Sequence, residues 1–126
     1  MCFYSVDTSS AAIVEYKRLV NLMLIEPLVE DLKKITGRII LFGSCARGSD
    51  TSRSDFDLFI VTNNRADAAA AVSEFSLPQS YEGLRIQPVI KTPVELLQAG
   101  ESERAFIDEV ERGIVLWEGV AREPRV

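Results

Sequence analysis

The sequence contains no histidine and only two cysteines, Cys2 and Cys45, so it lacks the usual ligands of a zinc site. A chain of 126 residues can bury a core without a disulfide, and we expect both thiols to be reduced. No apolar run approaches the roughly 20 residues that cross a bilayer. The first seven residues lack the basic-then-apolar order of a signal peptide. We therefore expect a cytoplasmic protein with no membrane partner.

Positive charge is also scarce, because 14 Lys and Arg face 19 Asp and Glu, a net charge of −5. The sequence has no basic stripe that could follow a phosphate backbone, which argues against direct nucleic-acid binding and favours a protein partner. Hydrophobic content of 47% and charged content of 26% are typical of a globular protein. The length predicts a single domain over residues 1–126.

A segment between two apolar runs carries most of the chemical signal. The run Arg38–Phe42 predicts a buried strand, and Phe56–Thr62 predicts a second. The residues between them are small and polar and show no long periodicity. We therefore expect two neighbouring strands joined by a short helical turn and a loop.

Two features of this segment favour a site for a phosphate and a cation. Glycine at Gly43 permits close approach of the backbone, and Ser44 adds a hydroxyl, so the pair predicts a phosphate seat. Asp55 and Asp57 are two residues apart at the start of a strand, so both carboxylates point to one face while Phe56 points to the other. Two such carboxylates form half of a site for a hard cation such as Mg²⁺.

The N-terminal part of the chain, residues 1–36, reads as helical. Ser9 or Ser10 can cap a helix over Ser9–Ile35. Pro27 is expected to cause a break or a kink, with Pro27 in the first turn of a second helix, and Gly37 is expected to provide a left-handed cap. The apolar face predicted for the first helix consists of Ala12, Ile13, Tyr16, Leu19, Val20, Met23 and Leu24. The face continues past Pro27 through Leu28, Leu32 and Ile35.

Residues 63–119 predict a helix, a third strand and two further helices, and residues 120–126 form a tail. The helices are expected over Asp67–Phe75, from a capping box at Thr92 to about Ala99, and over Glu103–Arg112. The third strand is expected over Leu84–Ile90, where Pro88 requires an edge position or a bulge. Ile114–Trp117 reads as a last short strand.

The central segment resembles the signature Gly-Ser-x-x-Arg-Gly followed by Ser-Asp-x-Asp-Leu of the DNA polymerase beta nucleotidyltransferase superfamily. The matching residues are Gly43, Ser44, Arg47, Gly48, Ser54, Asp55, Asp57 and Leu58. The whole chain is similar in size to the minimal nucleotidyltransferases of that superfamily.

This resemblance implies an α+β fold with a small mixed β-sheet flanked by helices. It also implies transfer of a nucleoside monophosphate from a nucleoside triphosphate, expected to be ATP, with one or two Mg²⁺ ions. Asp55 and Asp57 would bind the metal, and Gly43, Ser44, Arg47, Gly48 and Ser54 would bind the nucleotide. Arg47 has an alternative role as an ion-pair partner of Asp50, and Cys45 occupies a variable position of the signature.

The chain departs from the family at the third carboxylate that active members carry on a neighbouring strand. The corresponding position holds Gln87, whose amide oxygen can bind Mg²⁺ but cannot accept a proton at neutral pH. Glu82, in the preceding turn, is an alternative base or an ordinary solvated residue. Loss of a general base typically costs 10²–10⁴-fold in rate.

Three functions are compatible with these residues. The first is an enzyme that transfers a nucleotidyl group to a hydroxyl on a partner. By resemblance, that partner would be a helical HEPN-domain ribonuclease toxin, neutralised by adenylylation of a tyrosine, and this chain the antitoxin. The second is a catalytically weak or inactive module that binds nucleotide and partner, which Gln87 favours. The third, an antibiotic-modifying transferase, would require a homo-oligomer to complete its substrate pocket.

Overall fold

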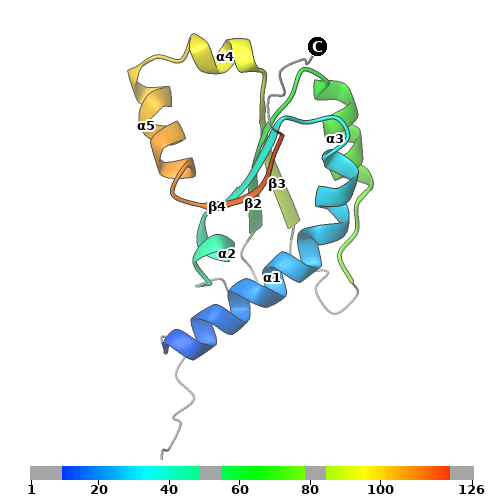
Figure 1. Cartoon of the computed structure of the whole chain (residues 1–126), viewed down its shortest axis with the longest axis vertical. Helices are drawn as coiled ribbons and strands as arrows, with labels where there is room; N and C mark the ends of the chain where they lie inside the picture. Colours follow the sequence, from blue (N-terminus) through cyan, green and yellow to red (C-terminus); the bar gives the residue numbers. More distant parts are fainter. Residues whose placement is uncertain (1–9, 49–54, 79–84, 120–126) are drawn as a thin grey trace, which may run out of the picture.

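The computed structural model describes residues 10–48, 55–78 and 85–119 (Figure 1). Several residues discussed above lie outside the described residues, namely Cys2, Ser9, Asp50, Ser54, Glu82, Leu84 and the tail at 120–126. In chain order the elements are α1 (Ala11–Leu32), β1 (Arg38–Phe42), α2 (Ser44–Arg47), β2 (Asp55–Val61), α3 (Arg65–Glu74), β3 (Arg85–Lys91), α4 (Pro93–Leu97), α5 (Glu101–Val110) and β4 (Ile114–Glu118).

The four described strands form one mixed sheet in the order β3-β2-β1-β4. β1 pairs antiparallel with β2 and β4, whereas β2 pairs parallel with β3. This arrangement confirms the α+β fold with a small mixed sheet flanked by helices. It also confirms that the strands on either side of the central segment are neighbours.

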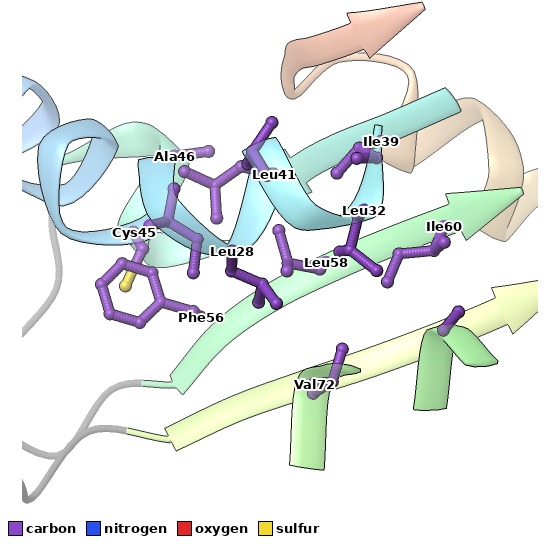
Figure 2. Packing of buried hydrophobic residues seen from close by; sticks show 13 residues of the cluster. Leu28, Leu32, Ile39, Leu41, Cys45, Ala46, Phe56, Leu58, Ile60 and Val72 are labelled. Carbon is purple, nitrogen blue, oxygen red and sulfur yellow. The ribbon is translucent and has the colours of Figure 1, made fainter. Parts of the chain in front are cut away.

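Helices cover both faces of the sheet (Figure 1). On one face, α1 and α3 pack against β1 and β2, and Figure 2 shows Leu28, Leu32 and Val72 on the same side as Leu58 and Ile60. On the other face, α4 and α5 cover the far end of the strands. The residues of this second cluster are Ile40, Phe59, Val61 and Val110, with Phe42, Val89, Leu96 and Ile107 beside them. Among the described residues, the side chains that cover the second face of β2 therefore lie beyond Asp57.

The predicted break at Pro27 is wrong, because α1 is continuous from Ala11 to Leu32 with Pro27 inside it. Pro27 lacks an N–H, so the carbonyl of Met23 loses its helical partner. Both residues lie on the exposed side of α1, where water can bond that carbonyl. The opposite side of the helix is held against the sheet by Ile25 and Leu28, both fully buried.

Two other expectations for α1 are also wrong. Tyr16, Leu19 and Met23 are 65%, 55% and 63% exposed, so they do not form the buried face. The helix ends at Leu32, and Gly37 is not in the left-handed conformation. The predicted cap at Ser10 is confirmed, since its side chain accepts a hydrogen bond from the Ile13 N–H at 3.2 Å.

The predicted elements after β2 are confirmed within a few residues. β3 is an edge strand, and its pairing with β2 continues through Leu58 and Pro88 without a bulge. The capping box of α4 is formed as predicted, with hydrogen bonds of 3.2 Å from the Glu95 N–H to Thr92 Oγ1 and 2.9 Å from the Thr92 N–H to Glu95 Oε1.

Candidate active site

Asp55 and Asp57 open β2 with both side chains half-buried, while Phe56 between them is fully buried on the other face. This is the alternation that their spacing predicts. Within the described part of the chain, α5 covers the second face farther along β2, and the two carboxylates lie before that covered stretch. Their positions are compatible with binding a cation from the side of solvent.

Gly43 lies directly against the Asp57 carboxylate. A Cβ atom placed on Gly43 would be 2.3 Å from Asp57 Oδ2, and the backbone of Gly43 has a φ of 79°. Both conditions exclude an unstrained side chain at this position. Glycine thus allows the turn after β1 and the start of β2 to meet at one point.

Gly48 has a similar requirement on the other side of the turn. It ends α2 in the left-handed conformation, and its Cβ would be 2.4 Å from the backbone oxygen of Val14 in α1. Ser44, half-buried, and Arg47, exposed, are the first and last residues of α2. The Arg-Gly pair therefore fixes α2 between α1 and β2, with Arg47 directed toward solvent.

The electrostatics of the site show that the carboxylates are close to one another. Burial raises the pKa of the Asp57 carboxyl above its ordinary value, and the negative charge of Asp55 raises it further. The positive charge of Arg47 acts in the opposite direction. A cation placed between the carboxylates would relieve the repulsion that raises this pKa.

Gln87 lies beside Asp57 in the parallel pairing of β2 and β3, so both side chains share one face of the sheet. The structure therefore places the predicted third position next to the carboxylates, with an exposed amide there. The same register puts Arg85 opposite Asp55, a pairing that sequence analysis missed. Among the described residues, no cluster of three or more Asp, Glu, Cys or His side chains could hold a metal ion.

A buried polar connection behind the site was also missed. Asn21 of α1 is 4% exposed and donates from Nδ2 to the backbone oxygen of Cys45 at 3.1 Å. The Cys45 thiol, fully buried, donates to the backbone oxygen of Asp55 at 3.3 Å. Cys45 thus does more than fill a variable position, because it connects α2 to the first carboxylate residue. The signal for Asn21 was its polar side chain four residues before Ile25 on the buried side of α1.

Comparison with known proteins identifies the family of the chain. The family model described as "Nucleotidyltransferase domain" matches residues 22–118, which contain the whole of β1, α2 and β2. The chain belongs to the nucleotidyltransferase domain family. The match covers most of the chain and includes every described element except the first half of α1.

A solved structure from Sulfolobus solfataricus, provisionally described as a nucleotidyltransferase, has 19% sequence identity to the chain and a TM-score of 0.49. The alignment covers 88% of this chain and 100% of that one. At this identity and score, the likeness adds nothing to the family assignment. The comparison with curated proteins found no match. Among the helices that the structure describes, none has the length and apolar character that a membrane span requires.

Proposed function

We propose that this nucleotidyltransferase domain binds a nucleoside triphosphate, with ATP as the first candidate, together with Mg²⁺, and transfers the nucleoside monophosphate to a hydroxyl group. The observation that supports this most is the convergence of Asp55, Asp57 and the Gly43 turn at the start of β2. Such a site joins carboxylates for a metal with backbone room for a phosphate.

The donor set fits Mg²⁺. Two carboxylates supply charge, the Gln87 amide oxygen lies in register beside them, and Mg²⁺ commonly keeps water and substrate phosphate oxygens as its other ligands. Mg²⁺ held there would neutralise negative charge on the reacting phosphate and on the leaving pyrophosphate.

In the proposed reaction, the acceptor oxygen forms a bond to the α-phosphorus while the bond from that phosphorus to the bridging oxygen of the β-phosphate breaks. The electron pair leaves with pyrophosphate. The acceptor proton passes to solvent, because the Gln87 amide cannot accept it at neutral pH. Ser44, Arg47 and Ser54 would orient the phosphates. Gly43 would let the phosphates approach the backbone of the turn, and Gly48 lets α1 pack close to it.

The acceptor would be supplied by a partner. Family resemblance makes a helical HEPN-domain protein the first candidate, with this chain as its antitoxin. A second candidate function, a module that binds nucleotide and partner without turnover, is favoured by one observation. Gln87 occupies the position beside Asp57 where a third carboxylate would complete the site.

The test uses purified protein, Mg²⁺, ATP labelled at the α-phosphate and a co-expressed HEPN-domain candidate. We expect label on the partner, and we expect Asp57→Asn to reduce transfer by about 10²-fold or more. Asp108→Asn, an equal charge change on the exposed side of α5, is the matched control. If the natural chain transfers the label and Asp57→Asn abolishes the transfer, the hypothesis of a binding module without turnover is excluded. If the chain binds nucleotide but labels no acceptor, the hypothesis of an enzyme is contradicted.

Metal binding is measured separately from activity. We expect Mg²⁺ to lower the pKa of the Asp57 carboxyl, because the ion stabilises the charged form. Carbon NMR of the Asp57 carboxyl measures this pKa with and without Mg²⁺. Since the pKa without metal is raised, Mg²⁺ should be displaced by protons at a higher pH than from an ordinary aspartate pair. If the pKa of Asp57 does not change when Mg²⁺ is added, the proposal that Asp57 binds Mg²⁺ is wrong.

A further inference from the structure

The first half of α1 presents apolar side chains that the rest of the described chain leaves unburied. Within the described residues, no side chain of α1 before Asn21 is buried. Tyr16, Leu19 and Met23 follow one another at helical spacing and are each more than half exposed. Figure 1 shows this half of the helix, in blue, extending beyond the strands. Helices in proteins are stabilised mainly by packing, so an apolar half-helix of this kind suits a surface that covers it.

A hollow of about 250 Å³ lies beside these residues, between the second half of α1 and β4. Its lining includes Met23, Glu26, Val29 and Glu30 from α1 and Leu116 from β4. The volume is below the range of small-molecule sites, about 300–1,000 Å³, so an inserted side chain fits it better than a ligand does. β4 is an edge strand whose pairing with β1 shifts register, which disfavours addition of a further strand there.

The charged residues on this side of α1 are complementary to a second copy that runs in the opposite direction. Glu15 pairs with Arg18 at 3.0 Å near the start of the helix, and Glu30 pairs with Lys33 at 2.9 Å near its end. In both pairs the carboxylate precedes the cation by three residues. When two antiparallel helices are level at position 24, Glu15 lies opposite Lys33 and Arg18 lies opposite Glu30. A parallel copy would place like charges opposite each other.

We propose that two copies of the chain associate through this side of α1, antiparallel and related by a two-fold axis near Met23. In that register Leu19 of each copy lies opposite Val29 of the other, over the hollow between α1 and β4. The protruding residues and the hollow belong to the same helix, so the two-fold axis produces two identical contacts. The inference is independent of the proposed function, because no residue of the candidate active site takes part in the contact.

Sedimentation equilibrium of the full chain over a range of concentrations measures this association. We expect a reversible dimer with a Kd of about 1–100 μM, because a contact along one helix is smaller than a standard interface. Leu19→Glu and Met23→Glu should each weaken the dimer by about 100-fold or more, since symmetry doubles each loss. Leu97→Glu is the matched control, because Leu97 is 83% exposed at the end of α4, and it should leave the Kd unchanged.

Disulfide crosslinking tests the direction of the two helices in a chain with Cys2→Ser. Met23→Cys should crosslink the two copies, because its two positions are offset by about 3 Å along an antiparallel pair. Leu19→Cys should not crosslink, because its two positions are about 15 Å apart along the same pair. Leu97→Cys measures the crosslinking that random collisions produce. Crosslinking of Leu19→Cys as efficient as that of Met23→Cys would indicate a parallel pair and overturn the inference.

Charge reversal tests the register. Glu15→Lys and Lys33→Glu should each weaken the dimer severalfold, because each places like charges opposite each other twice. The double variant should recover most of this loss, because opposite charges again face each other. A double variant that associates as weakly as the single variants would contradict the antiparallel register.

Two further results would overturn the inference. One is a natural chain that stays monomeric at every concentration, in which case residues 1–9 or a different protein would be the cover of this face. The other is a dimer that Leu19→Glu does not weaken, or that Leu97→Glu weakens equally. The positions of the three glutamate variants are exposed, so the variants should fold, which circular dichroism checks. If a glutamate variant unfolds, the crosslinking of Met23→Cys still decides between the outcomes.

Discussion

Gly43 has two independent reasons to be glycine, and both concern Asp57. Its φ of 79° is strained for any other residue, and the Asp57 carboxylate occupies the place of a side chain. A turn glycine would explain only the first. The contact with Asp57 therefore connects the glycine of the signature to the carboxylate fourteen residues later.

Gly43→Ala is expected to cost about 1–3 kcal/mol of stability from backbone strain alone. It should also weaken Mg²⁺ binding by about tenfold or more, because the new methyl group would displace the Asp57 carboxylate and a displacement near 1 Å can reduce the function of a site by that factor. Thermal unfolding and metal titration measure the two effects. Gly37→Ala is the control, because Gly37 has no positive φ and its Cβ would make an ordinary contact 3.8 Å from Val61 O. If Gly43→Ala binds Mg²⁺ as tightly as the natural chain, Asp57 can move without loss of metal affinity.

At the scale of the element, α1 shows how packing overrides a local signal. Proline in a helix interior is unfavourable by about 3 kcal/mol relative to alanine. The helix nevertheless continues through Pro27, because Ile25, Leu28 and Leu32 on its other side are fully buried against the sheet. The buried residues of α1 therefore decide that the helix continues, whatever the preference of Pro27.

Pro27→Ala is accordingly expected to stabilise the protein by about 1–2 kcal/mol, because the recovered helix preference exceeds the entropy that proline removes from the unfolded chain. Urea denaturation measures the change in unfolding free energy. Glu26→Ala, the exposed neighbour, should stay within about 0.5 kcal/mol of the natural chain. Lower stability of Pro27→Ala would mean that the shape imposed by proline is needed for the fit of α1 on the sheet.

At the scale of the whole molecule, the register of β2 and β3 decides which residue accompanies the carboxylates. Asp57 pairs with Gln87 and Asp55 with Arg85, although thirty residues separate each pair in the chain. The sheet thus supplies a place for a third carboxylate and fills it with an amide. Slow turnover or none is the expected consequence, since general-base help is worth 10²–10⁴-fold.

Gln87→Asp should therefore increase the rate of nucleotidyl transfer by about 10²-fold or more and tighten Mg²⁺ binding. Without metal, the added negative charge should raise the pKa of Asp57 further, so the variant should be less stable than the natural chain at neutral pH until Mg²⁺ is added. Gln98→Asp, the same change at an exposed position after α4, should alter neither rate nor metal affinity. A Gln87→Asp protein with no gain in metal affinity would show that this position does not face the metal.

Local patterns explain what the sequence could predict. The strands β1 and β2, the capping box at Thr92 and the alternation of Asp55, Phe56 and Asp57 depend on neighbours in the chain, and all agree with the structure. The roles proposed for Gly43, Ser44, Arg47, Gly48 and the two aspartates rest on the same signature, and these roles stay predictions. The buried side of α1 was predicted correctly at Leu28 and Leu32 but wrongly at Tyr16, Leu19 and Met23, because periodicity orders the faces of a helix without showing which face the sheet covers.

By itself, the sequence determined the family, the carboxylate pair and the glycines of the turn, because each can be recognised from consecutive or closely spaced residues. Only the tertiary structure decided how distant residues join that segment. It brought Asn21 to Cys45 and Gln87 to Asp57. These contacts depend on strand register and on close backbone approach at Gly48, which local preferences do not specify.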